Sequence, residues 1–212
     1  MSIAGHATTE GTARYRERLQ GETIAANHFR LEQNLWLSSV GIGTYLGKPD
    51  AATDARYTEA VTRAVALGAN VIDTAANYRF QRSERSIGAA LSQLLESDDA
   101  AAAATARDEI VVCTKGGYIP FDGDPPNGQE GVSRYIAKTF VETGIADFPD
   151  FAAGSHCMTP KYLAHQIDQS LGNLRLAAID VYYIHNPETQ LGVVSRAEFE
   201  TRLRAAFEQL ER

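Results

Sequence analysis

Residues 71–78 read VIDTAANY, and this stretch decides how the rest of the sequence is interpreted. A short apolar run ends in an acid, Asp73, and a tyrosine, Tyr78, follows five residues later. Short apolar runs bounded by polar residues are typical of strands whose two faces are both covered. We therefore predict a strand over residues 70–73, with a carboxylate at its carboxyl end and a phenol shortly beyond it.

Two further apolar runs end in the same way. Residues 110–114 lead directly to Lys115, and residues 179–184 lead directly to His185. In parallel sheets the carboxyl ends of the strands meet at one edge, and functional residues collect there. An acid, a phenol, an amine and an imidazole at three successive strand ends therefore predict one shared site.

Strand-like and helix-like segments alternate along the chain, which indicates an α/β fold with a parallel sheet and helical crossovers. A glycine-containing strand is expected within residues 39–45, after a possible hairpin within residues 29–40. Helical spacing of apolar residues and capping residues predict four helices, at residues 54–67, 83–95, 159–174 and after a capping box at 195–198. Four βα units follow from this pattern.

The remaining segments are harder to assign. Residues 1–28 are interpreted as a loose N-terminal extension, and residues 29–212 as the folded domain. Residues 96–108 are expected to end a helix and form a surface loop. The stretch 116–158 has no clear period and is long for a connection, so it is interpreted as a functional loop or a small inserted element.

Composition narrows the class of protein. The 212 residues carry a formal net charge of −7 and no long basic run, which argues against nucleic acid and against an anionic membrane as partners. No apolar run approaches the ~20 residues of a membrane span. Two cysteines, Cys113 and Cys157, fit a reducing cytoplasm, and no histidine or cysteine spacing indicates a metal site. The oligomeric state stays open.

The four strand-end groups are suited to the reduction of a carbonyl. Negative charge grows on the carbonyl oxygen as hydride arrives, so donors aimed at that oxygen lower the barrier. A phenol with an ordinary pKa of about 10 becomes a better acid when a neighbouring ammonium stabilises the phenolate. Lys115 can supply this charge to Tyr78, Asp73 can hold Lys115, and His185 can orient the substrate. The hydride requires a cofactor.

Each residue also has a plainer interpretation. Asp73 could cap a turn, Tyr78 could be an ordinary core or surface aromatic, and Lys115 could form a structural pair with Asp73. His185 could be a satisfied histidine at a strand end. The joint pattern is more specific than any of its members.

These motifs resemble those of the aldo-keto reductases. Residues 71–78 with the Ser83-Glu84 pair are similar to that family's aspartate–tyrosine motif, and the segment ending at Lys115 is similar to its lysine strand. Residues 180–187, DVYYIHNP, resemble its histidine strand, and residues 41–45, GIGTY, resemble its first strand.

The resemblance implies a (β/α)8 barrel of the TIM type with an N-terminal hairpin, in which NADPH reduces aldehydes or ketones. It implies that Tyr78 donates the proton, that Lys115 and Asp73 tune it, and that His185 orients a small carbonyl substrate. By the same resemblance, the nicotinamide end of the cofactor lies near Gly43, Thr44, Tyr45 and Asp73.

Other functions stay open alongside this one. A barrel lyase or aldolase could use Lys115 to form a Schiff base, and a non-catalytic regulatory subunit could share the fold. We also expect that the chain is the first half of a longer protein, that alone it binds NADPH weakly or not at all, and that alone it could be inactive.

Overall fold

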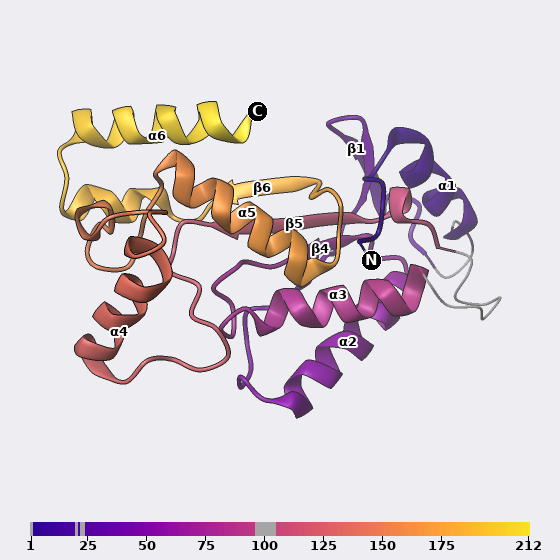
Figure 1. Ribbon diagram of the computed structural model, residues 1–212. Helices are drawn as coiled ribbons and strands as arrows, with labels where there is room; N and C mark the ends of the chain where they lie inside the picture. Colours follow the sequence, from indigo (N-terminus) through magenta and orange to yellow (C-terminus); the bar gives the residue numbers. More distant parts are fainter. Residues whose placement is uncertain (1, 20, 22–23, 96–104) are drawn as a thin grey trace.

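The computed structural model describes residues 2–19, 21, 24–95 and 105–212 (Figure 1). Its described strands form two sheets, a hairpin and an open parallel sheet in the order β3-β4-β5-β6. The hairpin consists of β1 (Phe29–Glu32) and β2 (Leu35–Ser38). The parallel sheet consists of β3 (Ile42–Gly43), β4 (Val71–Asp73), β5 (Val111–Gly116) and β6 (Val181–Ile184). The predicted α/β class with a parallel sheet is confirmed, whereas a closed eight-stranded barrel stays a prediction.

Four long helices follow the four parallel strands in chain order. They are α2 (Ala51–Ala66), α3 (Arg82–Leu95), α5 (Pro160–Leu174) and α6 (Arg196–Leu210). The carboxylate of Asp50 accepts a hydrogen bond from the backbone N–H of Thr53, so α2 begins earlier than its apolar pattern predicted. Ser195 caps α6 as its sequence predicted, whereas the side chain of Thr159 makes no cap to α5.

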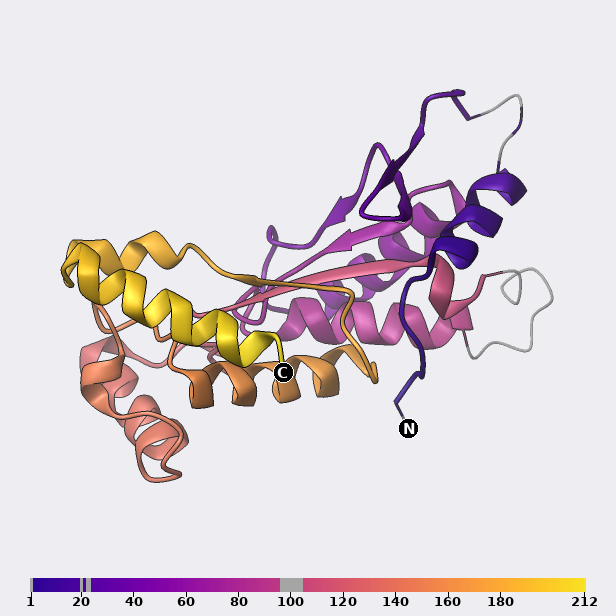
Figure 2. The same ribbon diagram turned by 90° about the horizontal axis from the view of Figure 1, so that it is seen from above.

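The parallel sheet has two differently covered faces. Ile72 and Val112 point toward α2 and α3, where they join the main hydrophobic core. Contacts then run from α2 to α3, from α3 to α5 and from α5 to α6, so the helices follow one another along one side of the sheet (Figures 1 and 2). The opposite face carries Val111 and Cys113, which pack against Leu37 of the hairpin.

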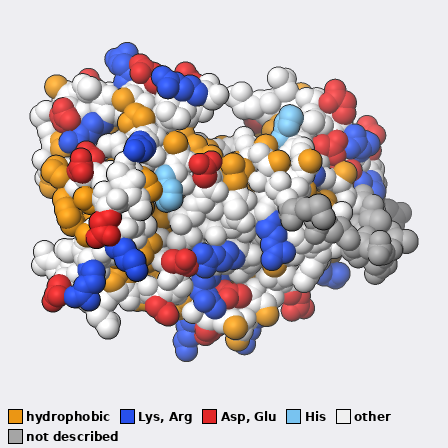
Figure 3. All heavy atoms as spheres, viewed as in Figure 1, with side chains coloured by type: hydrophobic (Ala, Val, Ile, Leu, Met, Phe, Trp, Pro, Cys, Tyr) orange, Lys and Arg blue, Asp and Glu red, His pale blue; other side chains and the backbone are white. Residues whose placement is uncertain are grey.

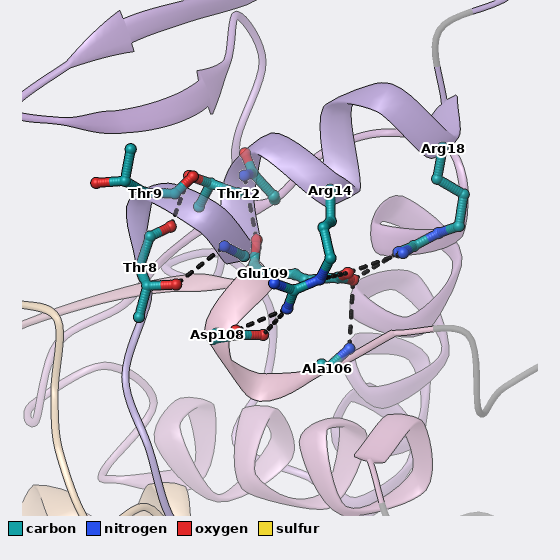
Figure 4. A network of polar contacts seen from close by, with 10 residues as sticks. Thr8, Thr9, Thr12, Arg14, Arg18, Ala106, Asp108 and Glu109 are labelled. Carbon is teal, nitrogen blue, oxygen red and sulfur yellow. Dashed lines mark hydrogen bonds and ion pairs between the residues drawn. The ribbon is translucent and has the colours of Figure 1, made fainter.

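The amino ends of the strands are closed by the N-terminal part of the chain, against the expectation of a loose extension. Helix α1 (Thr9–Leu19) buries Tyr15, which is 1% exposed and donates a hydrogen bond from its hydroxyl to the carbonyl of Val65. Figure 4 shows Arg14 and Arg18 of α1 directed toward two acids of the short helix η1 (Arg107–Glu109). The ion pairs are Arg14 with Asp108, Arg14 with Glu109, and Arg18 with Glu109.

The expectation failed because α1 is polar over most of its length. One buried aromatic ring and the ion pairs hold it, and these partners lie 50 or more residues away in the chain. Such contacts leave no periodic apolar pattern for sequence reasoning to detect. Residues 2–8 add a short bridge from Ile3 to Leu176.

Residues 116–158 contain a small folded element. Its helical segments are α4 (Gly128–Ile136), η2 (Ala137–Val141) and η3 (Phe148–Asp150). They surround a separate hydrophobic cluster in which Phe140 is fully buried against Phe151 and against Tyr162 of α5. Of the two interpretations of this stretch, the structure supports an inserted element with its own core. It is called the insertion below and comprises residues 117–158.

The loop expected over residues 96–108 falls mainly on residues 96–104, which lie outside the described residues. No helix in the described part of the chain combines the length and apolar character that crossing a bilayer requires. On the face drawn in Figure 3, acidic and basic side chains are interspersed and form no continuous patch of one sign.

Candidate active site

The alternation of side chains along the strands brings the predicted residues to one face. Val111 and Cys113 of β5 face away from the long helices, so Lys115 does the same. In β4 the same alternation places Asp73 on that face, and Cys113 is its neighbour in the sheet register. His185 follows the end of β6, where its backbone N–H donates a 2.7 Å hydrogen bond to the carbonyl of Gly116.

Lys115 is the centre of the site. Its Nζ donates to the carboxylate of Asp73 at 2.6 Å and to the carbonyl of Thr74 at 2.7 Å. The same atom lies 5.0 Å from the centroid of the Tyr78 ring. The side chain of Lys115 is only 16% exposed, whereas that of Asp73 is 44% exposed. Lys115 is thus held between an anion and the face of a phenol.

Tyr78 stands directly before an unusual turn. Arg79, Phe80 and Gln81 all have positive φ values, of 49°, 58° and 69°. A left-handed residue other than glycine costs roughly 1–2 kcal/mol, so contacts elsewhere must hold this turn. The insertion supplies two of them, because the backbone N–H of Gly123 donates to the carbonyl of Phe80 and the Gln81 amide donates to the carbonyl of Pro120.

The side chain of Arg79 anchors the same turn to α2 and to the segment before it. It is buried, donates to the carbonyl of Lys48 at 3.0 Å and pairs with the carboxylate of Asp54 at 2.5 Å. Its guanidinium also lies 5.1 Å from the centroid of the Tyr57 ring. The position of Tyr78 is therefore fixed by α2 and by the insertion together.

A row of aromatic rings crosses the site. Ring centroids are 5.0 Å apart for Tyr45 and Tyr78, 5.6 Å for Tyr78 and His185, and 5.2 Å for His185 and Tyr118. All three pairs meet edge to face, which is a favourable arrangement for aromatic rings. The imidazole of His185 is therefore held between the phenol of Tyr78 and the ring of Tyr118.

His185 is kept neutral by its surroundings. Burial, followed by the nearby charge of Lys115 and by His156, lowers its pKa to about 4. Its Nδ1 is buried and has no hydrogen-bond partner among the described residues. A neutral imidazole carries one N–H, and Nε2 is the nitrogen left for contact with a ligand.

A buried carboxylate supports the lysine strand from the helix side. Glu84 of α3 accepts hydrogen bonds from the hydroxyl of Thr114 at 2.7 Å and from the amide of Asn173 at 2.9 Å. Burial raises the pKa of Glu84, and these hydrogen bonds act in the opposite direction. The side chain ties α3 and α5 to the residue next to Lys115.

The residues expected near a cofactor differ in their exposure and in whether their polar atoms are free to bind it. Tyr45 is 66% exposed beside Tyr78, and the space around Gly43 is open. Thr44 is fully buried, its hydroxyl donates to the hydroxyl of Thr74 at 2.8 Å, and its carbonyl accepts from Ser83 at 2.7 Å. Thr44 therefore braces the strand end, and its hydroxyl and carbonyl are already engaged.

Sequence reasoning missed the residues behind His185. It gave no role to His156, Tyr118 or Gln190. His156 contacts the backbone of His185, Tyr118 contacts its ring, and Gln190 contacts His156. The one local signal was the glycine pair after Lys115, because a glycine often marks a close approach of another group. Gly117 has a φ of +131°, and a Cβ there would lie 2.6 Å from Nε2 of His156.

Within the described residues, no group of three or more His, Cys, Asp or Glu side chains could hold a metal ion. The site consists of an ion pair, phenols and a neutral imidazole.

Comparison with solved structures finds similarity to aldo-keto reductases. A protein of Pseudomonas aeruginosa assigned as an aldo-keto reductase has 20% identity and a TM-score of 0.50, over 84% of this chain and 54% of that one. An aldo-keto reductase of Bacillus halodurans in its holo form has 20% identity and a TM-score of 0.47, over 84% of this chain and 47% of that one.

An aldose reductase of Giardia lamblia has 18% identity and a TM-score of 0.43, over 69% of this chain and 32% of that one. The chain thus spans between 32% and 54% of the length of these three proteins. No curated protein matches the chain. The family model of the aldo/keto reductases matches residues 39–211, which include every strand of the parallel sheet and all four predicted catalytic residues. The chain therefore belongs to the aldo/keto reductase family.

Proposed function

We propose that the chain carries the catalytic residues of an NADPH-dependent oxidoreductase that reduces aldehydes or ketones to alcohols. The observation that supports this most directly is the position of the Lys115 ammonium, 2.6 Å from the carboxylate of Asp73 and 5.0 Å from the centre of the Tyr78 ring. Membership of the family and the open strand edges favour the (β/α)8 barrel for the whole protein. Buried, free Cys113 and Cys157 fit a reducing cytoplasm.

In the proposed reaction, Tyr78 gives its hydroxyl proton to the carbonyl oxygen as hydride reaches the carbonyl carbon. The C=O π bond is lost, and a C–H bond and an O–H bond form, so the product is an alcohol. The ammonium of Lys115 stabilises the phenolate that Tyr78 leaves, and Asp73 holds Lys115 in position. Water then returns a proton to Tyr78. NADPH supplies the hydride when it is bound.

His185 completes the set of donors. Its pKa of about 4 makes the imidazole neutral near pH 7, so it offers a single N–H. With Nδ1 buried, the donor to a carbonyl oxygen would be Nε2. A neutral donor can polarise the carbonyl and orient a small substrate without adding a second full charge beside Lys115.

The residues present fit the nicotinamide end of such a cofactor. Tyr45 offers an exposed ring, and Gly43 leaves open space at the carboxyl edge of the sheet. Asp73 offers a half-exposed carboxylate next to them. We propose that these three residues hold the nicotinamide end and that Thr44 acts through the strand end that it braces.

The pairing of Lys115 argues against the lyase. A Schiff base requires an amine that is free to attack a carbonyl carbon, whereas Nζ of Lys115 donates to the carboxylate of Asp73 at 2.6 Å and to the carbonyl of Thr74 at 2.7 Å. We therefore expect no covalent adduct on Lys115 after treatment with a ketone and borohydride, as read by peptide mass spectrometry. An adduct on Lys115 would favour the lyase.

The catalytic proposal is tested with Tyr78→Phe. At NADPH concentrations well above its dissociation constant, the unaltered chain should oxidise NADPH in a carbonyl-dependent manner. The rate of the variant should be lower by roughly 100- to 10,000-fold, because a positioned general acid accelerates a reaction by about that factor. NADPH affinity should change little. Absence of carbonyl-dependent oxidation in the unaltered chain, or an unchanged rate in the variant, would contradict the proposal. Tyr183→Phe, on β6, is the matched control.

Cofactor affinity is expected to be weak in this 212-residue chain. Lys115, the cation at the centre of the site, is already paired with Asp73, and the described sheet offers the ends of four strands. Phosphate groups of a dinucleotide therefore gain little compensation for lost hydration. Isothermal titration of NADPH into the chain should give a dissociation constant above ~100 μM. This corresponds to a binding free energy weaker than about −5.5 kcal/mol. Low-micromolar binding would refute this expectation.

A further inference from the structure

His156 brings the insertion into contact with the back of His185. It is fully buried, and its Nε2 lies 2.8 Å from the backbone carbonyl oxygen of His185. A carbonyl oxygen only accepts hydrogen bonds, so Nε2 of His156 must carry the proton. The backbone of His185 is thus held at both ends, because its N–H donates to the carbonyl of Gly116.

A chain of donors fixes the tautomer of His156. Its Nδ1 lies 3.1 Å from the amide nitrogen of Gln190, which donates, so Nδ1 must accept. The orientation of that amide is set in turn by Arg202 of α6, whose guanidinium donates to Oε1 of Gln190 at 3.3 Å. A guanidinium has no acceptor atom, so each residue donates a hydrogen bond to the next, from Arg202 to Gln190, then to His156 and finally to His185.

Tyr118 connects the two imidazoles through their rings. Its ring centroid lies 5.1 Å from that of His156 and 5.2 Å from that of His185, both edge to face. Its hydroxyl is 2.8 Å from the hydroxyl of Thr189, which precedes Gln190. The absence of a side chain at Gly117 leaves room for the ring of His156, because any side chain there would collide with it.

We propose that His156, in its neutral Nε2–H form, is a positioning residue that holds the imidazole of His185 against Tyr78. It acts through the carbonyl of His185 and through the ring of Tyr118, and it touches neither substrate nor cofactor. This role rests on the proposed function of His185. The insertion would then carry part of the catalytic machinery in addition to its own core.

The charged and titratable groups around the two imidazoles are consistent with neutral rings. Lys115, Asp73 and Glu188 act on His185, and the phenols of Tyr78 and Tyr118 flank it. Burial lowers the pKa of His156, while the carbonyl of His185 and the charge of Glu188 oppose this. Protonation of His156 would turn its Nδ1 into a second donor facing the donor amide of Gln190, which would break the chain.

The experiment follows the imidazole signals of the full 212-residue chain by NMR as the pH is varied. His156→Phe keeps a ring beside Tyr118 and removes the N–H donor, whereas His156→Gln keeps an N–H donor. We expect the pKa of His185 to rise by about one pH unit or more in His156→Phe, because the freed ring gains water. In His156→Gln it should stay near the value of the unaltered chain.

Two outcomes would overturn the proposal: an unchanged His185 titration in His156→Phe, or equal shifts in both variants. If His156→Phe does not fold, Gln190→Leu decides. Loss of the amide donor should let His156 populate both tautomers, as read from its ring ¹⁵N shifts, and a single unchanged tautomer would refute the chain of donors. These readouts need no turnover, so they stand even if the chain shows no reductase activity and the proposed function fails.

If the unaltered chain is active, a kinetic readout adds to these. His156→Phe should lower kcat/KM by roughly 10- to 100-fold, as expected for misplacement of a catalytic group by about 1 Å. His156→Gln should recover most of that loss, and both should bind NADPH as the unaltered chain does. A rate for His156→Phe equal to that of the unaltered chain would contradict the positioning role.

Discussion

At the scale of single residues, the notable feature is a histidine that stays neutral next to a lysine. Burial and the charge of Lys115 lower the pKa of His185 to about 4, against 6.5 for an ordinary imidazole. Between these two values the unfolded chain takes up a proton that the folded chain does not. The free energy of unfolding therefore falls as the pH is lowered through this range.

This fall in the free energy of unfolding at lower pH leads to a testable prediction. The unaltered chain should lose more stability between pH 6.5 and pH 4 than His185→Gln, which has no imidazole to protonate. Urea unfolding at several pH values measures the two slopes. Glu84, whose raised pKa acts in the opposite direction, is present in both chains and cancels in the comparison. Parallel slopes would contradict the assignment.

At the scale of elements, the contact between α3 and α5 depends on one glycine. A Cβ at Gly88 would lie 2.4 Å from the backbone oxygen of Asn173, so the two helices meet there without an intervening side chain. The same two helices carry Glu84 and Asn173, which hold the residue beside Lys115. Their close approach therefore also sets the support of the lysine strand.

Two glycine substitutions separate helix propensity from packing. Gly172→Ala in α5 has open space around its Cβ and should stabilise the chain by up to about 1 kcal/mol. Gly88→Ala should gain the same propensity but lose roughly 1–3 kcal/mol through overpacking, giving net destabilisation. Thermal or urea unfolding measures both. A stabilising Gly88→Ala would show that the helices can move apart freely.

At the scale of the whole molecule, the amino ends of the strands are closed by chain segments far from them in sequence. Helix α1 is tied to η1 by ion pairs and to the C-terminal end of α2 by the hydroxyl of Tyr15 (Figure 4). The hairpin adds the hydrogen bond from the backbone of Ser38 to the side chain of Asn70. These contacts leave the opposite edge of the sheet, with Lys115 and His185, as the open one.

Removal of one hydroxyl tests this closure. Tyr15→Phe should cost about 1 kcal/mol, because the buried hydrogen bond to Val65 is lost. A loss of that size lowers Tm by roughly 2–4 °C in a chain of this length. Tyr57→Phe is the control, since its hydrogen bond to Leu46 is exposed and should matter by less than ~0.5 kcal/mol. Equal effects would argue against the anchoring role of α1.

The strands and most helices could be predicted from the sequence because their signals are local. Apolar runs before Asp73 and Lys115 mark β4 and β5, and the capping serine at Ser195 marks the start of α6. Alternation along a strand also fixes which residues share a face. The gathering of Asp73 and Lys115 therefore follows from the order of residues once a parallel sheet is assumed.

Only the tertiary structure decided what surrounds those residues. The polar helix α1, the left-handed turn after Tyr78 and the contact of His156 with His185 all depend on partners dozens of residues away. A buried polar contact leaves no periodic pattern in the sequence. A single histidine also gives the same sequence signal whether it is exposed or hydrogen-bonded to a second histidine. Periodicity reports which face is buried, whereas the fold decides which groups meet there.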